Sequence, residues 1–305
     1  MHEKHPKKRM ALLLASAFFF ISPFLNVIAR EQRDRGNLMQ NTPFLPPSDG
    51  EDADVVDGGR EYTLSVSAGK ENPYGWPKIS SYTTYYNPKE GGRCENIAIA
   101  ASLIDGVTVQ GYGEFSFNST VGKRTEEAGF QQAKIIVNGE YVQGVGGGVC
   151  QVSTTLYNAA LKSGLTVTEY HPHSLCVAYV SPSRDAMVST HSDLCFINPR
   201  PYPVHLSASV FEGGIRIAFY GENEGDRYEI TSNRLEEIPP PAPIITQGDK
   251  DEILRAPKNG IKSEAYLERY RGAQLLSREK LRTDEYRPIQ GIIVKKSAQE
   301  PNSDK

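Results

Sequence analysis

The sequence lacks the short motifs that bind nucleotides or mark several common enzyme classes. It has no Gly-x-Gly-x-x-Gly turn before a helix and no Gly-Lys-Ser/Thr phosphate loop. It also has no Gly-x-Ser-x-Gly nucleophile elbow. Kinase, nucleotide and nicotinamide chemistry therefore have no support, and we expect the protein to use no cofactor.

An excess of positive charge is absent too. Lys and Arg number 34 against 37 Asp and Glu, which gives a net charge of −3. Such a balance offers no basic field for phosphates, so we expect no nucleic-acid partner. The 27 Gly and 20 Pro argue against a helical bundle.

Cysteine is scarce, with four residues in 305. That is too few for a disulfide-held miniature domain, and a chain of this length can bury a core without such bridges. Cys176 and Cys195, together with His171, His173 and His191, match no familiar zinc spacing, so we expect no metal. A Cys176–Cys195 disulfide and four reduced thiols both remain open.

The N-terminus has the pattern of an export signal. Residues 2–9 are rich in Lys, Arg and His, and residues 11–28 carry no charge. A basic segment before an apolar one is typical of a signal peptide, and its length is at the lower edge for a membrane span. Residues 1–29 are thus expected to be a cleaved signal or a membrane anchor, and the protein is expected to be extracytoplasmic, either secreted or membrane-anchored.

Composition divides the remaining chain into five parts. Residues 30–72 are polar and rich in Asp, Gly and Pro, as in a disordered linker, and three consecutive prolines at 239–241 indicate a second break. The expected parts are the linker 30–72, a main domain 73–236, a proline-rich spacer 237–243, a small C-terminal β-rich module 244–296 and a disordered tail 297–305.

Hydrophobic periodicity predicts an α+β fold, with few helices packed on a mostly antiparallel sheet. Asn138-Gly139 between two β-rich runs is a strong hairpin signal. The expected helices are 96–104 and 150–162, and the expected strands after the second helix are 174–180, 194–197, 205–210 and 215–220.

The segment around Cys150 is the most unusual part of the chain. Gly146, Gly147 and Gly148 precede the thiol, which stands at the start of the second expected helix. Backbone N–H groups and the positive end of a helix dipole favour a thiolate and could stabilise an oxyanion. The alternative is structural: a small buried Cys, with glycines that permit close packing.

A nucleophilic thiol needs a general base and a group that orients it. His173 is our candidate base, ahead of His171 and His191, and Asp185 or Asp193 could orient its ring. The order of Cys at a helix start, His on a strand and then Asp is that of transglutaminase-like and papain-like enzymes.

Several motifs together resemble the vancomycin-resistance-associated VanW family, over residues 93–221. They are Gly113-Glu-Phe-Ser-Phe-Asn118, Val121-Gly-Lys-Arg-Thr125, Gly146-Gly-Gly-Val-Cys-Gln-Val-Ser-Thr-Thr-Leu-Tyr-Asn-Ala-Ala160, His173-Ser174, Asp185-Ala186 and Asp193-Leu194. The resemblance implies an extracytoplasmic protein of the cell envelope, and the family's Cys, His and Asp positions map onto Cys150, His173 and Asp185. The chain after residue 238 also resembles, more weakly, the G-five-type modules of cell-wall proteins.

Two functions follow from these observations. In the first, Cys150, His173 and Asp185 are the catalytic residues of a thiol-dependent hydrolase or acyl-transferase acting on peptidoglycan or another wall polymer. In the second, the protein is a non-catalytic wall-binding or assembly module associated with glycopeptide antibiotic resistance. For either function the expected substrate-binding residues are Gly146, Gly147, Gly148, Gln151 and Ser153.

Overall fold

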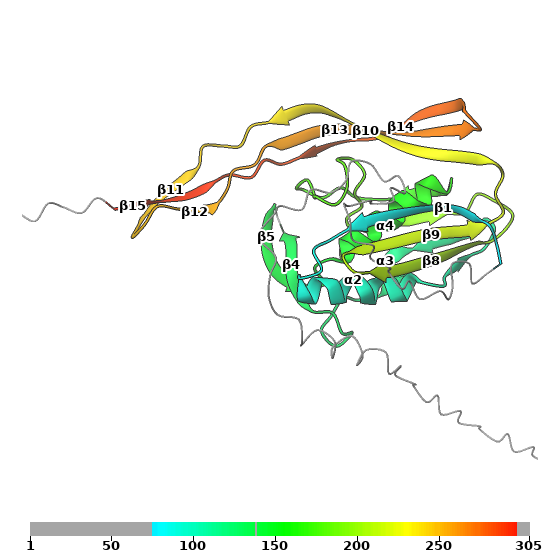
Figure 1. Ribbon diagram of the computed structural model, residues 1–305, viewed down its shortest axis with the longest axis horizontal. Helices are drawn as coiled ribbons and strands as arrows, with labels where there is room; N and C mark the ends of the chain where they lie inside the picture. The colour runs from blue at the N-terminus through cyan, green and yellow to red at the C-terminus, as the bar shows by residue number, and fades with distance from the viewer. Residues whose placement is uncertain (1–74, 138, 298–305) are drawn as a thin grey trace, which may run out of the picture. The chain divides into compact units, whose positions relative to one another are not determined.

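The structure is a computed structural model that describes residues 75–137 and 139–297. The expected signal or anchor, the linker and all but one residue of the tail therefore lie outside the described part. Within that part, few helices pack on sheets that are almost entirely antiparallel, so the predicted α+β class is confirmed (Figure 1).

The main sheet has four strands in the order β1-β9-β8-β2, and all its pairs are antiparallel. Its strands are β1 (Lys78–Tyr85), β2 (Thr108–Val109), β8 (Val204–Phe211) and β9 (Gly214–Gly221). The expected strands 205–210 and 215–220 are thus confirmed as the β8–β9 hairpin. Ile215, Ile217 and Phe219 of β9 are fully buried, which places the core against this sheet.

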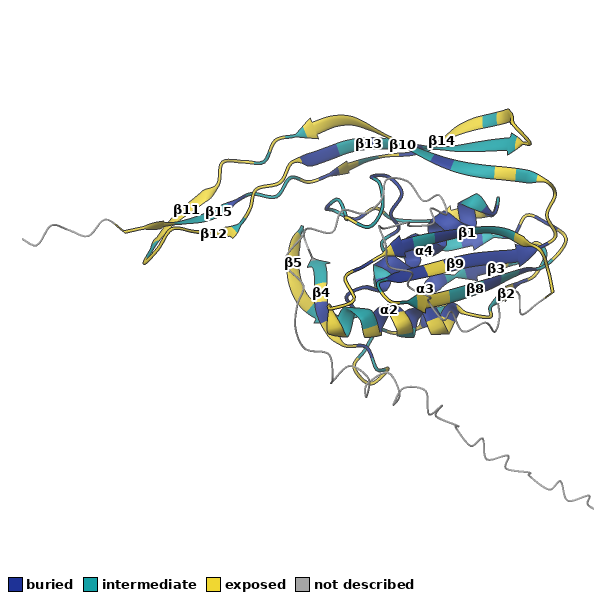
Figure 2. Ribbon diagram, viewed as in Figure 1, coloured by how far each residue is buried: buried dark blue, intermediate teal, exposed yellow. Residues whose placement is uncertain are grey.

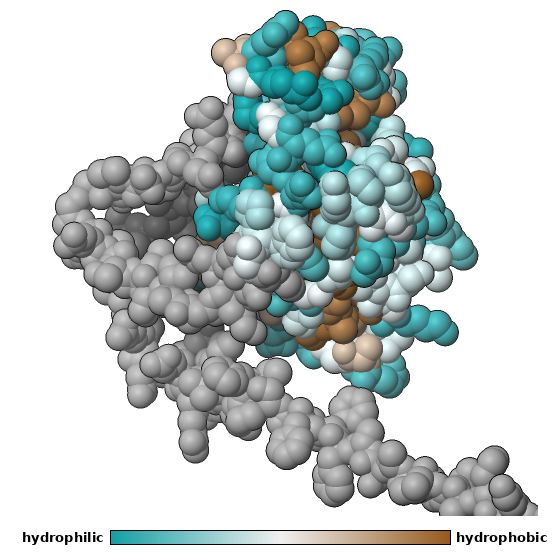
Figure 3. Space-filling view, turned by 90° about the vertical axis from the view of Figure 1, so that its right-hand side faces the viewer, coloured by the Kyte–Doolittle hydropathy of each residue, from teal (hydrophilic) through white to brown (hydrophobic). Residues whose placement is uncertain are grey.

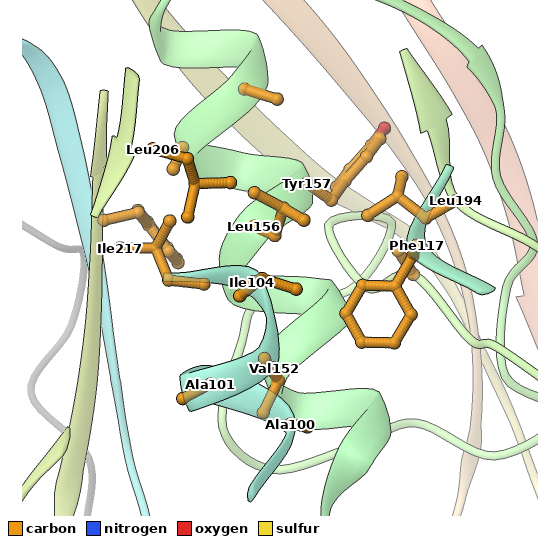
Figure 4. Packing of buried hydrophobic residues seen from close by; sticks show 14 of the residues in the cluster. Ala100, Ala101, Ile104, Phe117, Val152, Leu156, Tyr157, Leu194, Leu206 and Ile217 are labelled. Atoms are coloured by element: carbon orange, nitrogen blue, oxygen red, sulfur yellow. The ribbon is translucent and has the colours of Figure 1, made fainter. Parts of the chain in front are cut away.

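Three helices accompany the sheet: α2 (Gly91–Ile104), α3 (Phe117–Val121) and α4 (Val149–Lys162). The first begins five residues earlier than its apolar spacing predicted, whereas α4 agrees with the prediction to within one residue. Leu156 of α4 packs between Ile104 of α2 and Leu206 of β8 in the core (Figure 4).

Helix α4 is buried on all sides rather than on one face (Figure 2). Its apolar residues were expected inside, but its polar residues are buried as well. A buried hydroxyl or amide is costly unless it is hydrogen-bonded, so each of these polar side chains needs a protein partner. Those partners lie in the segments that carry the candidate site.

Two smaller antiparallel groups flank the helices. One is the sheet β3-β7-β6, made of β3 (Glu114–Ser116), β6 (Thr166–Glu169) and β7 (Cys195–Ile197). The other is the hairpin of β4 (Gln132–Val137) and β5 (Glu140–Val145), which confirms the predicted pairing of the two β-rich runs, although Asn138 itself lies outside the described residues.

The connection from β6 to β7, residues 170–194, contains no helix or strand. The strand expected over 174–180 was therefore wrong, and His173 does not stand at a strand entrance. Leu175 is buried, but the segment pairs with no strand and is fixed instead by single hydrogen bonds to its neighbours. Irregular connections this long are uncommon in compact domains and are often functional.

The C-terminal part contains two further three-stranded sheets. The first, in the order β10-β13-β14, consists of β10 (Asp226–Ile238), β13 (Gly260–Arg271) and β14 (Gln274–Tyr286). The second, β11-β15-β12, consists of β11 (Ile244–Gly248), β12 (Glu252–Arg255) and β15 (Ile292–Lys296), and its β11–β15 pair is parallel. The boundary expected at residues 236–237 falls inside β10.

In the described residues no helix is long and apolar enough to cross a membrane. On the face shown in Figure 3, hydrophilic residues predominate and the hydrophobic ones occupy small separate areas. Such a mixture is ordinary for a protein surface.

Candidate active site

Cys150 is the second residue of α4, directly after the glycine-rich turn. Gly148 has a φ of 109°, a backbone conformation that favours glycine. A Cβ on Gly147 would lie 2.6 Å from the carbonyl oxygen of Lys134, so the turn also needs glycine for close packing against β4. The glycines that were expected to bind substrate therefore shape the backbone that presents the thiol.

His173 and Asp185 lie beside this thiol. The Nδ1 atom of His173 is 2.7 Å from Oδ2 of Asp185, and the backbone N–H of His173 donates to the same oxygen at 2.7 Å. The imidazole also interacts with the Cys150 thiol, and each of the two groups shifts the pKa of the other. The structure thus groups the three residues onto which the VanW resemblance mapped the family's Cys, His and Asp positions, and of the two candidate carboxylates it is Asp185 that binds His173.

This arrangement changes the acidity of all three groups. Burial alone would raise the pKa of the Cys150 thiol, but the hydrogen bond and charge of His173, with the charge of Arg124, lower it overall. Burial would lower the pKa of His173, yet Asp185 and Cys150 raise it to about 9. The pKa of Asp185 is lowered despite its burial, chiefly by His173. These directions favour a thiolate–imidazolium pair.

The polar side of α4 holds the segment that carries Asp185. Ser153 Oγ donates to the carbonyl of Ala186 at 2.6 Å, and the backbone N–H of Ala186 donates to Thr154 Oγ1 at 3.0 Å. Asn158 Nδ2 donates to the carbonyl of Arg184 at 2.8 Å. One helix therefore carries Cys150 and also fixes the backbone on both sides of Asp185.

Gln151 and Ser153 were expected to contact substrate, but the structure gives them internal roles. Both are fully buried. The amide of Gln151 donates to Thr84 at 3.0 Å and to the carbonyl of Tyr85 at 2.9 Å, and it accepts from Arg93 at 2.6 Å. Because their polar atoms are already bonded inside the fold, these side chains hold α4 in place.

Arg124 adds a positive charge near Cys150. Its guanidinium donates to Asn118 Oδ1 at 2.8 Å and to the carbonyl of Ser189 at 3.3 Å. The carbonyl of Val188, next to Ser189, accepts the Cys150 thiol at 3.4 Å. Arg124 and Asn118 therefore fix the chain that borders the sulfur on this side.

Two groups near the thiol could bind a developing negative charge. The backbone N–H of Cys150 has no acceptor within the described residues, as is usual in the first turn of a helix. Tyr179 lies near enough to Cys150 and Asp185 to feel their charges. Its burial and the negative charges of Cys150 and Asp185 raise its pKa, so the phenol keeps its proton.

His171 and Asp193, the alternative candidates for the base and its orienting carboxylate, have other partners. His171 pairs with Glu169 at 2.9 Å. Asp193 accepts from Ser116 at 2.5 Å and from the backbone of Asn118 at 2.8 Å, so it caps α3 and leaves Asp185 to bind His173. No cluster suited to a metal occurs over 75–137 and 139–297.

The four cysteines, all of which lie in the described residues, are unpaired. A Cys176–Cys195 disulfide is therefore not formed. The thiol of Cys195 lies instead near the carboxylates of Asp193 and Glu169, at 3.5 and 3.9 Å.

Sequence reasoning missed the residues of β14 that reach the site. Arg282 and Tyr286 contact the carboxylate of Asp185 from about 100 residues further along the chain. They belong to the part expected to form a separate module, and no local motif marks them.

Comparison with known proteins identifies the region that contains this site. Residues 92–220 match the model of the family described as VanW like protein. The chain contains a VanW-like domain. The uncharacterized protein YoaR of Bacillus subtilis (strain 168) is 39% identical over 163 residues, which cover 53% of this chain and 52% of YoaR. The chain thus spans about half the length of that relative.

A solved structure, the crystal structure of HP0197-G5, is 17% identical to this chain. The match covers 23% of this chain and 97% of that one, with a TM-score of 0.13, and at that score the likeness carries no argument. The G-five-like character of the chain after the VanW-like domain stays a prediction.

Proposed function

We propose that the VanW-like domain is a thiol-dependent hydrolase or acyl-transferase. The observation that carries this proposal is the grouping of Cys150, His173 and Asp185: the imidazole is bonded to Asp185 at 2.7 Å and lowers the pKa of the Cys150 thiol. A thiol, a base that holds it and a carboxylate that orients the base are the parts of a nucleophilic acyl-transfer site.

The reaction has two steps. The Cys150 thiolate attacks the carbonyl carbon of an amide or ester, a C–S bond forms, and the carbonyl electron pair moves to oxygen. The His173 imidazolium then gives its proton to the leaving amine or alcohol as the scissile bond breaks, which leaves a thioester. Water or an acceptor amine attacks the thioester, His173 takes the proton of this nucleophile, and the C–S bond breaks to restore the thiolate.

The negative oxygen formed in each step needs donors. The backbone N–H of Cys150 is free to supply one, at the positive end of α4. Tyr179 can supply a second because its phenol stays protonated beside the sulfur. Asp185 does not react: it keeps Nδ1 of His173 protonated and directs Nε2 toward Cys150.

Location and substrate class belong to the same proposal. The basic and apolar N-terminus supports export with membrane attachment, and the VanW family supports a role at the cell envelope. A peptidoglycan stem peptide or another wall polymer offers amides and esters there. The residue order Cys, His and Asp is also that of papain-like enzymes, although His173 stands in an irregular segment rather than on a strand.

The site geometry supports catalysis more than the binding-module alternative. A groove that only binds a polymer needs no thiol whose pKa is lowered by a buried imidazole. Three ionisable groups that shift one another's pKa values are typical of functional sites.

The direct test is to trap the thioester. The full chain is mixed with purified peptidoglycan fragments at neutral pH, quenched in acid and mapped by mass spectrometry, with Cys150→Ser as the control. We expect an acyl mass on the peptide that contains Cys150. No adduct and no released product with wall peptides or with simple thioester-forming acyl donors would contradict the proposal.

A further inference from the structure

The carboxylate of Asp185 is held from two directions. Its Oδ2 atom faces His173, whereas its Oδ1 atom accepts the hydroxyl of Tyr286 at 2.5 Å and Nη2 of Arg282 at 3.2 Å. Nη1 of Arg282 also donates to the backbone carbonyl of Asp185 at 2.6 Å. Both donors belong to β14, beyond the residues that match the VanW family.

These donors are themselves buried and fixed. Arg282 is 5% exposed, and its guanidinium lies 4.8 Å from the ring centre of Tyr170 and 6.0 Å from that of Tyr157. Its Nε donates to Asp284 at 2.6 Å. A buried guanidinium between two carboxylates stays charged and has little freedom to move.

Tyr286 is 1% exposed and makes a second contact with the connection that carries the site. Its hydroxyl accepts the backbone N–H of Ser183 at 2.7 Å while donating to Asp185. The phenol therefore fixes both the backbone before Asp185 and the direction of its carboxylate.

The same sheet contacts this connection at further points. Ser263 of β13 is hydrogen-bonded to Ser183 Oγ at 2.8 Å, and the backbone N–H of Arg287 donates to the carbonyl of Ser174 at 2.9 Å. The hydroxyl of Ser232 in β10 donates to the carbonyl of Pro182. The segment with His173 and Asp185 therefore has α4 on one side and the β10-β13-β14 sheet on the other.

We infer that Tyr286 and Arg282 are positioning residues of the active site, so that the catalytic unit comprises the VanW-like domain together with the β10-β13-β14 sheet. This inference rests on the proposed function. The two donors prevent rotation of the Asp185 carboxylate, which keeps Oδ2 on Nδ1 of His173 and Nε2 on Cys150. A base held by such outer contacts retains the geometry that acid–base transfer needs.

The test compares two variants that each remove one buried hydroxyl from the interface between this sheet and the connection. Tyr286→Phe removes the contact with Asp185, whereas Ser263→Ala removes a contact with Ser183 and leaves Asp185 untouched. The rate of Cys150 alkylation by iodoacetamide is measured from pH 5 to pH 10 on the full chain, with peptide mapping to isolate Cys150. Thermal unfolding shows that both variants are folded at the labelling temperature.

For Tyr286→Phe we expect the apparent Cys150 pKa to rise toward its free value of about 8.5, with labelling at pH 7 slower by about five-fold or more. Ser263→Ala is expected to keep the wild-type pH profile. Arg282→Lys keeps the charge but cannot bridge Oδ1 and the backbone carbonyl oxygen of Asp185. It is expected to give a smaller shift of the same sign, and it replaces Tyr286→Phe should that variant not fold.

The outcomes separate this inference from the function on which it depends. If His173→Ala slows labelling but Tyr286→Phe and Arg282→Lys leave the profile unchanged, the positioning role is overturned and the proposed function stands. If Ser263→Ala shifts the profile as much as Tyr286→Phe does, the sheet acts only by general support and the inference is again overturned. If His173→Ala has no effect, both proposals are wrong.

Discussion

His173 binds the same oxygen of Asp185 twice, through its backbone N–H and through Nδ1, each at 2.7 Å. Two bonds from one residue to one oxygen fix the ring relative to its own backbone. They also leave Nε2 as the nitrogen that faces Cys150. The imidazole beside the thiol therefore has a fixed orientation.

Replacement of His173 tests this arrangement most directly. Without the imidazole, burial dominates and the Cys150 pKa is expected to rise to its free value or above. A thiol with a pKa of about 8.5 is only about 3% thiolate at pH 7, so alkylation of Cys150 in His173→Ala should slow at least about ten-fold. The measurement is a pH series of iodoacetamide labelling.

His171→Ala is the matched control, since His171 is two residues away and pairs with Glu169. It should change the Cys150 labelling rate by less than about two-fold, because no charge near the sulfur is altered. Equal slowing by both substitutions would show that the imidazole of His173 has no special role.

The four thiols should differ in reactivity, with Cys150 the fastest near neutral pH. Its pKa is lowered, whereas burial raises the pKa values of Cys94 and Cys176. Burial and the carboxylates of Asp193 and Glu169 raise the pKa of Cys195 to about 12. Sub-stoichiometric labelling at pH 7 followed by peptide mapping should place most of the label on Cys150. Faster labelling of any other cysteine would contradict the thiolate–imidazolium pair.

The sequence predicted correctly those elements that form because of residues within them or directly beside them. The glycine-rich turn and the apolar spacing after it placed α4 and Cys150 correctly, and the residues that follow α4 correctly suggested His173, which is bonded to Asp185. Residue order could not decide whether Asp185 or Asp193 orients His173. That decision depends on α3, because Asp193 caps this helix.

The features that depend on contacts between distant parts of the chain could not be predicted from the sequence. The connection at 170–194 was partly mistaken for a strand because its buried residues are as apolar as those of a strand. Gln151 and Ser153 look like exposed polar residues at a helix start, yet they are buried by β1 and by the chain at Ala186. The contact of Tyr286 with Asp185 spans 101 residues, and no spacing rule reaches that far.

The pH dependence of stability should show that Cys150 and His173 titrate as a pair. Between about pH 6.5 and 8.5 the unfolded chain carries a neutral His and a protonated thiol, and the thiolate–imidazolium pair that the pKa directions favour also holds one proton, on His173. The number of bound protons is then the same in both states. This pair therefore adds nothing to the pH dependence of the free energy of unfolding.

Cys150→Ser should create a slope in this range. We expect His173 to gain a proton on folding in this variant as well, because Asp185 still raises its pKa after the contribution of Cys150 is lost, whereas the thiol no longer releases one. The stabilisation that comes from protonated His173 is complete below about pH 6.5 and is lost as pH rises through the folded pKa of His173. The free energy of unfolding then changes by up to about −1.4 kcal/mol per pH unit. Urea unfolding of both proteins at pH 6, 7 and 8 measures this difference. Parallel curves would mean that Asp185 alone does not keep His173 protonated against burial.

Gly148 should be far less tolerant of a side chain than another glycine with positive φ. A Cβ at Gly148 would lie 3.0 Å from both Cγ and the backbone oxygen of Arg93, whereas a Cβ at Gly122 would meet nothing within 4 Å. The φ values are 109° and 74°, so both alanine variants carry backbone strain, but only one also displaces a neighbour.

We expect Gly122→Ala to lower the free energy of unfolding by about 1 kcal/mol and Gly148→Ala by about 2–3 kcal/mol in urea titrations. The displaced neighbour matters for the site because Arg93 donates to Gln151, the residue that follows Cys150. Gly148→Ala should therefore also slow Cys150 labelling, while Gly122→Ala should leave it unchanged. An equal loss of stability in the two variants would show that Arg93 moves away at no cost and that the close packing of the turn does not hold α4.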